Sequence, residues 1–156
     1  MSTGAWIALT AVVLALAVGL WRAATDGRFR GTHAVRSCSP AEPLVEEGAP
    51  ASVARPGAEL VASLGETLGE RATLLQFSSA FCAPCRATRR VLGEVSGLVE
   101  GVAHVEVDAE HHLDATRALG ILRTPTTIVL DAAGVEVTRA TGAPTRDQVL
   151  TALAAT

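Results

Sequence analysis

The chain of 156 residues contains no lysine, so all 13 of its Lys and Arg positions are arginine, against 16 acidic residues. The absence of lysine carries no functional information by itself. The formal net charge of −3 argues against a nucleic-acid-binding protein, which needs an excess of positive charge. Hydrophobic residues make up 49% of the sequence, which is enough for the core of one ordinary domain with an appendage.

Cysteine is also scarce, with three residues, two of which form the C-x-x-C pair Cys82 and Cys85. This pattern indicates a redox or metal motif rather than a disulfide framework, which a chain of this size does not need. A zinc site would require further ligands, but there is no second C-x-x-C, and the adjacent His111 and His112 lack the spacing of zinc ligands. We therefore interpret the pair as a redox motif and predict no metal site.

The beginning of the chain lacks charge, because residues 4–21 contain no acidic or basic side chain. This run approaches the ~20 apolar residues that cross a bilayer, and Trp6 and Trp21 bracket it as interfacial tryptophans do. A cleaved signal peptide is the alternative, but no basic residue precedes the run and Arg22 closes it. We therefore predict a single transmembrane anchor at residues 1–24.

The charges that flank this run predict its orientation. Four arginines follow it, at positions 22, 28, 30 and 36, whereas only the terminal amine precedes it. The positive-inside rule then gives an N-out/C-in protein of the cell membrane, with the rest of the chain in the cytoplasm. An extracytoplasmic domain is the alternative.

Hydrophobic periodicity is absent from residues 25–57, where prolines, glycines and acidic residues dominate. We expect this segment to be a flexible linker. Cys38 lies within it, far from the apolar run and preceded by Arg36, so we interpret it as an incidental thiol rather than a lipid-attachment site.

Residues 58–156 show the alternation of an α/β domain. Helical spacing predicts helices at residues 58–70, 84–99, 113–119 and 145–155, the last with Thr145 as its N-cap. Apolar or alternating runs predict strands at residues 72–78, 104–108, 126–130 and 135–140, and residues 131–134 form the turn of a hairpin. This order implies a mixed central sheet covered by helices on both faces.

The position of the C-x-x-C pair, between a strand and a helix, indicates its chemistry. Cys82 is expected just before the helix, where free backbone N–H groups and the positive end of the dipole favour a thiolate and lower its pKa below the free value of about 8.5. Cys85, one turn later, is placed to attack a mixed disulfide formed on Cys82. Pro84 suits the first helical turn, where its missing N–H is not needed.

The sequence from residue 58 to 155 resembles the thioredoxin family. Residues 81–86, Phe-Cys-Ala-Pro-Cys-Arg, are similar to the family's W-C-G-P-C-K motif, and residues 123–126, Arg-Thr-Pro-Thr, match the segment that carries its cis-proline. The turn at residues 131–134 and Gly142 match two further landmarks in the same order. The resemblance implies a thioredoxin-like fold for residues 58–156.

The resemblance also implies a function, a thiol-disulfide oxidoreductase with Cys82 and Cys85 as its catalytic residues. With the predicted anchor the protein would be membrane-tethered, and on the cytoplasmic side it would reduce protein disulfides. No dissociable cofactor is implied, and the partners are protein disulfide substrates and another protein that donates electrons. The residues expected to contact the substrate are Phe81, Ala83, Pro84, Thr124 and Pro125.

One departure from the family concerns proton transfer. A buried aspartate usually precedes the motif, whereas this chain has Gln76, which cannot act as a general base. Water, His104 or the substrate would then have to take its place. Two other functions stay open at this point: an extracytoplasmic protein acting on exported or cytochrome-maturation clients, and a poorly active binding module.

Overall fold

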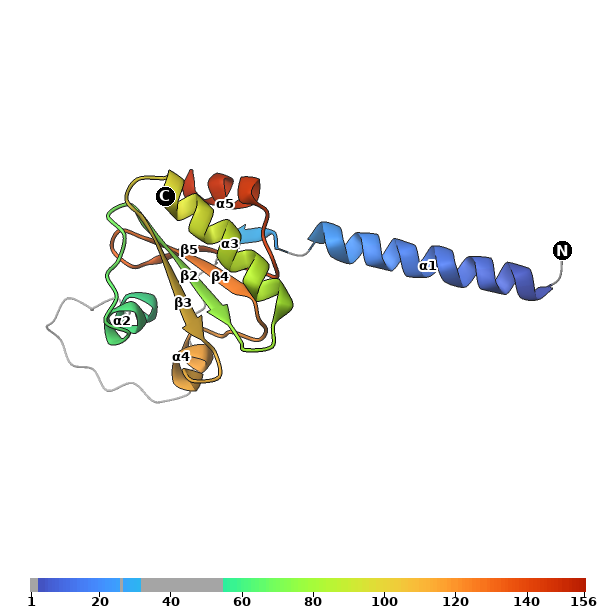
Figure 1. Ribbon diagram of the computed structural model, residues 1–156, viewed down its shortest axis with the longest axis horizontal. Helices are drawn as coiled ribbons and strands as arrows, with labels where there is room; N and C mark the ends of the chain where they lie inside the picture. The colour runs from blue at the N-terminus through green and yellow to red at the C-terminus, as the bar shows by residue number, and fades with distance from the viewer. Residues whose placement is uncertain (1–2, 26, 32–54) are drawn as a thin grey trace, which may run out of the picture.

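The computed structural model describes residues 3–25, 27–31 and 55–156. A helix, α1 (Thr3–Thr25), stands apart from an α/β domain (Figure 1). The strands are β1 (Phe29–Gly31), β2 (Ala72–Ser78), β3 (Val102–Asp108), β4 (Thr126–Asp131) and β5 (Glu136–Thr141). The helices of the domain are α2 (Pro56–Ser63), α3 (Ala83–Leu98), α4 (Leu113–Ala118) and α5 (Arg146–Leu153).

The strands form one sheet in the order β1-β5-β4-β2-β3. β2 and β3 run parallel, whereas β2 and β4, β4 and β5, and β1 and β5 pair antiparallel. The predicted mixed sheet is therefore confirmed. β2 lies between β4 and β3, and all seven of its residues are buried, which explains its nearly continuous apolar run.

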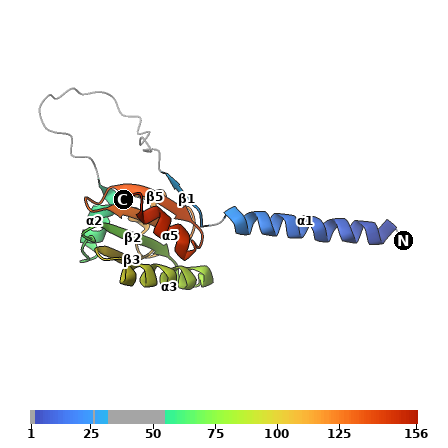
Figure 2. The same ribbon diagram turned by 90° about the horizontal axis from the view of Figure 1, so that it is seen from above.

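Helices cover both faces of this sheet, as predicted (Figures 1 and 2). Alternate residues of β2 point to opposite faces, so Leu74 packs with Leu92 of α3 and Val149 of α5, while Leu75 joins a second cluster that includes Leu60 of α2. The two apolar clusters fix β2, and hence the loop that follows it, between the helix layers.

The ends of two helices illustrate local control by single residues. Thr145 caps α5 as predicted, because its Oγ1 accepts the N–H of Gln148 while the Gln148 side chain accepts the N–H of Thr145. The helix predicted at residues 58–70 is shorter and ends at Ser63. Gly65 follows with φ of 74°, a left-handed conformation that terminates helices.

β1 lies within the segment that the sequence predicts to be a linker. Phe29 is paired with Ala140 of β5, and the N–H of Gly27 donates to the carbonyl of Thr141 at 2.9 Å. Three residues are too few to show the alternating pattern of a strand, so the sequence gives no sign of β1. The sheet thus reaches back into residues 25–57, of which residues 26 and 32–54, including Cys38, lie outside the described part of the chain.

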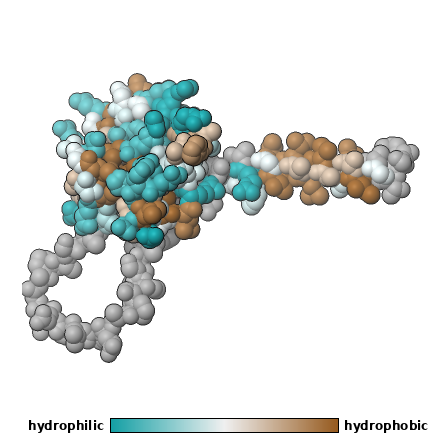
Figure 3. All heavy atoms as spheres, turned by 60° about the horizontal axis from the view of Figure 1, so that its bottom comes forward, coloured by the Kyte–Doolittle hydropathy of each residue, from teal (hydrophilic) through white to brown (hydrophobic). Residues whose placement is uncertain are grey.

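The helix α1 has 23 residues and exposes large apolar side chains along its length, including Trp6, Leu14 and Trp21 (Figure 3). Of the residues that the structure describes, none belongs to a helix that qualifies by length and apolar character as a membrane span. This finding does not confirm the transmembrane anchor predicted for residues 1–24.

Candidate active site

Cys82 and Cys85 form a disulfide at the start of α3, directly after the loop that leaves β2. Cys82 is the N-cap residue, and its Sγ accepts the N–H of Cys85 at 3.1 Å. Ala83 and Pro84 open the helix, and a proline in this first turn costs no hydrogen bond. The helix start thus directs a backbone donor and a positive dipole end toward Cys82, and both favour a thiolate there when the pair is reduced.

The two cysteines differ in exposure. Cys82 is partly exposed, whereas the side chain of Cys85 is buried, with 2% of its surface accessible. Phe81, next to Cys82, is 97% exposed. A large substrate can therefore reach the sulfur of Cys82 beside an apolar side chain, but not that of Cys85.

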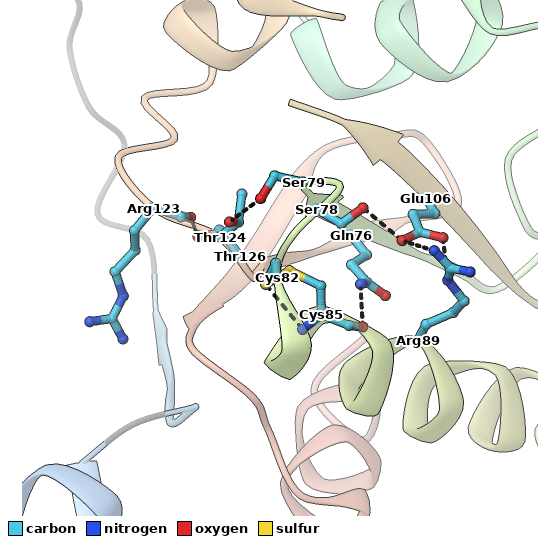
Figure 4. The surroundings of a disulfide bond; sticks show 10 residues. All are labelled: Gln76, Ser78, Ser79, Cys82, Cys85, Arg89, Glu106, Arg123, Thr124 and Thr126. Carbon is cyan, nitrogen blue, oxygen red and sulfur yellow. Dashed lines mark hydrogen bonds and ion pairs between the residues drawn. A yellow bond between two sulfur atoms is a disulfide. The ribbon is translucent and has the colours of Figure 1, made fainter. Parts of the chain in front are cut away.

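A second loop carries the other predicted residues. The Thr124–Pro125 peptide bond is cis, as expected from the sequence. The hydroxyls of Thr124 and Ser79 lie 3.2 Å apart, and this hydrogen bond joins the proline loop to the loop before the cysteines (Figure 4). The structure therefore brings the two predicted segments together.

Leu122 was not predicted. It lies two residues before Thr124 and is 96% exposed. Phe81 beside Cys82 is also almost fully exposed, so each of the two loops that meet at the disulfide carries one accessible large apolar side chain. Its only signal in the sequence is its proximity to the Thr124–Pro125 pair.

Gln76 lies beneath the disulfide with no exposed surface. Its Nε2 donates to the carbonyl oxygen of Cys85 at 3.0 Å (Figure 4). Its Oε1 lies 3.2 Å from Nε2 of His104. Because an amide oxygen only accepts, this contact assigns a proton to Nε2 of His104. Gln76 is thus satisfied on both ends and fixes the backbone of Cys85.

The pKa of His104 is lowered from its ordinary value of 6.5, first by burial and also by the positive charge of Arg89, while Glu106 opposes the shift. The loss of hydration on burial disfavours the charged imidazolium more than the nearby carboxylate of Glu106 favours it. His104 is therefore neutral near pH 7 and uses its Nε2 proton to hold Gln76.

A polar cavity of about 330 Å³ opens beside the disulfide, and both cysteines line it. Its other charged lining residues are Arg86, Arg89, Glu106 and Asp108. Sequence reasoning did not single out the two acidic residues, although they alternate along β3 and so share one face of the sheet. That alternation is the signal that could have found them.

The two carboxylates in the cavity have different partners. Glu106 accepts the hydroxyl of Ser78 at 2.6 Å and forms an ion pair with Arg89, with Nε of Arg89 2.5 Å from Oε2. Asp108 accepts the N–H of Glu110 and contacts Nδ1 of His111, and these contacts lower its pKa, the backbone bond most. His111 is a surface residue, with 79% of its side chain exposed.

Within residues 3–25, 27–31 and 55–156, no three His, Cys, Asp or Glu side chains are grouped to hold a metal ion.

The fold and the Cys82–Cys85 disulfide define a class, the thioredoxin-fold proteins with a redox-active C-x-x-C pair, and support thiol-disulfide oxidoreductase activity in general. The family model named Thioredoxin matches residues 61–155. The chain belongs to the thioredoxin family. A search of curated protein sequences found no match.

Solved structures agree with this assignment. A mutant thioredoxin of Halobacterium salinarum NRC-1 is 19% identical, with a TM-score of 0.50 over 54% of this chain and 73% of that one. Fasciola hepatica thioredoxin is 20% identical, with a TM-score of 0.50, and the match covers 62% of this chain and 86% of that one. Spinach chloroplast thioredoxin f in its short form is 25% identical, with a TM-score of 0.50, and the match covers 56% of this chain and 77% of that one. These similarities support the fold.

Proposed function

We propose that this protein reduces disulfide bonds in protein substrates through Cys82 and Cys85. The observation that carries the proposal is the asymmetry of the pair. Cys82 is partly exposed at a helix start with a backbone donor on its sulfur, and Cys85 is buried one turn later. A nucleophile needs access and a stabilised thiolate, whereas a resolving thiol needs only to reach the first sulfur.

The reaction follows from this arrangement. The thiolate of Cys82 attacks one sulfur of a substrate disulfide, which forms a mixed disulfide and releases the other substrate sulfur as a thiolate. Cys85 then attacks the sulfur of Cys82, which forms the Cys82–Cys85 disulfide and releases the second substrate thiol. Two electrons pass to the substrate, so another protein must reduce the pair again, and no dissociable cofactor is needed.

Substrate binding is proposed to use the two loops that meet at the disulfide. The backbone of Thr124, before the buried Pro125, pairs with an extended substrate segment as an added strand would. Phe81, Ala83 and Pro84 are exposed and supply apolar contact area beside Cys82. Leu122 extends this apolar area on the second loop.

We also propose that α1 attaches the protein to the cell membrane, N-out/C-in, with the domain in the cytoplasm. Its support is the exposure of apolar side chains on all sides of a 23-residue helix, a pattern that lipid would cover. In a Cys82→Ser/Cys85→Ser variant only Cys38 carries a thiol. A membrane-impermeant maleimide should then label it only after lysis of the cells. Labelling of intact cells would place the domain outside, and recovery of the protein without membranes would refute the attachment.

Trapping of mixed disulfides tests the activity. Cys85→Ser should accumulate protein adducts that dithiothreitol releases on a non-reducing gel, because the first step proceeds and the second cannot. Cys82→Ser, the matched control, should accumulate none. Absence of adducts from both variants would refute the reductase and would favour a module that binds partners without exchange.

A further inference from the structure

Resolution of the mixed disulfide requires Cys85 to lose a proton, and this requirement rests on the function proposed above. The Cys85 side chain is 2% exposed, so bulk water has little access to it. The buried side chain beneath it, Gln76, donates to its carbonyl, and an amide cannot take up a proton at neutral pH. The proton acceptor has to be sought in the cavity that Cys85 lines.

We propose that Glu106 accepts the proton of Cys85 through water in this cavity. Glu106 and Cys85 both line the 330 Å³ space, which is large enough for several water molecules. In the parallel pairing of β2 and β3, Glu106 is the register partner of Gln76, so its side chain lies beside Gln76 on the face that α3 covers (Figure 4). The neighbouring strand β3 thus carries, as Glu106, the carboxylate that β2 lacks at Gln76.

The contacts of Glu106 leave room for one more hydrogen bond, from a water molecule in the cavity. Its Oε1 accepts from Ser78 at 2.6 Å and from Nη2 of Arg89 at 2.8 Å, and its Oε2 accepts from Nε of Arg89. A carboxylate has about four acceptor positions, so three contacts leave one for water. The same contacts keep the Glu106 side chain in one position at the wall of the cavity, where a free glutamate side chain would move between rotamers.

Other titratable groups near the cavity are less suited to take the proton. Asp108 is the second carboxylate of the cavity, but its contacts with the N–H of Glu110 and with His111 lower its pKa and make it a weaker base. His104 is held by Gln76 and is not among the residues that line the cavity. The charged or titratable groups that face Glu106 are Arg86 and Arg89 from α3, and His104 and Asp108 from its own strand.

The thiol proton of Cys85 passes through water to Glu106, and the resulting thiolate attacks Sγ of Cys82, so that the bond between Cys82 and the substrate sulfur breaks as the Cys82–Cys85 bond forms. The departing substrate thiolate then takes the proton back from Glu106. Glu106 ends the cycle as a carboxylate, and no further oxidant or reductant is involved.

Stopped-flow mixing of the reduced full-length chain with Ellman's reagent separates the two steps, in a Cys38→Ser background so that only the active pair reacts. The first release of thionitrobenzoate reports attack by Cys82, and the second reports resolution by Cys85. Glu106→Gln should not slow the first release and should slow the second at least about tenfold at pH 7, a conservative figure for the loss of a positioned base. The difference should narrow as the pH rises, because hydroxide then takes the thiol proton in place of Glu106.

The sign of the effect distinguishes proton transfer from simple electrostatics. Removing a negative charge near Cys85 would by itself favour its thiolate and speed up the second release. Asp108→Asn removes a charge from the same cavity and is the matched control, which should not slow resolution. Equal second rates in wild type and Glu106→Gln at pH 7 would overturn the proposal, and so would equal slowing by Asp108→Asn.

Two further outcomes keep the test decisive. If Glu106→Gln does not fold, as judged by far-UV circular dichroism, Glu106→Asp takes its place. The retracted carboxylate should slow resolution at pH 7 less than glutamine would, and a pH profile identical to wild type would refute the proposal. Absence of the first release in the wild type would instead refute the proposed function, because Cys82 would not be a nucleophile.

Discussion

Replacement of Gln76 by alanine tests whether this buried amide supports the active site. The substitution removes two hydrogen bonds, to the carbonyl of Cys85 at 3.0 Å and to His104 at 3.2 Å, from a side chain with no exposed surface. Each bond contributes about 1 kcal/mol net, and the lost buried methylene contributes about 0.8 kcal/mol more. We therefore expect the free energy of unfolding of the oxidised protein to fall by about 3 kcal/mol.

Urea unfolding of the full-length chain followed by far-UV circular dichroism measures this change. Tryptophan fluorescence is unsuitable, because Trp6 and Trp21 both lie in α1. Thr88→Val is the matched control, since Thr88 is equally buried and its Oγ1 has no partner among the described residues. It should leave the stability unchanged or raise it. A loss below about 1 kcal/mol for Gln76→Ala would mean that less than one net hydrogen bond is lost and that the buried amide does not support the site.

Two predictions concern redox state and pH. Reduction of Cys82–Cys85 should lower the free energy of unfolding by about 2 kcal/mol, the chain-entropy value for so short a loop; coincident urea midpoints of the oxidised and reduced protein would contradict this. Burial holds the folded-state pKa of His104 below 6.5, so the unfolded state binds more protons as the pH falls through 6.5, and stability declines. His104→Gln should therefore flatten the profile of stability between pH 7 and 5, and parallel profiles for both proteins would argue against it.

Much of the fold could be predicted because its elements have strong local signals. The continuous apolar run of β2 and the Thr145 cap of α5 lie where the sequence places them. The helix after the cysteines, expected at residues 84–99, is observed as Ala83–Leu98, because its apolar face repeats at helical spacing. Strands β3, β4 and β5 differ from their predictions only at their ends.

Other features depend on tertiary contacts and left no such signal. β1 has three residues, and only its pairing with β5 makes it a strand. Helix α2 ends at Ser63 because Gly65 adopts a left-handed conformation. A glycine can also lie inside a helix, so its presence in the sequence does not decide where α2 ends.

The site was predictable in its sulfur chemistry but not in its surroundings. The spacing of Cys82 and Cys85 between a strand and a helix predicts a dithiol, and the Thr124–Pro125 loop follows from the family resemblance. The place of Glu106 depends on the register of β3 against β2 and on Arg89 from α3, which no local pattern encodes. Gln76 and the proposed proton acceptor Glu106 are neighbours only through this register, so the sequence around Gln76 does not reveal Glu106.

The central claim is that Cys82 is the nucleophile and Cys85 the buried resolving thiol. Brief treatment of the reduced full-length chain with substoichiometric iodoacetamide at pH 7, followed by peptide mass spectrometry, tests it most directly. We predict that the label appears on Cys82 well before Cys85, because Cys82 combines exposure with the backbone donor of the α3 start. Equal labelling of the two, or faster labelling of Cys85, would contradict the account.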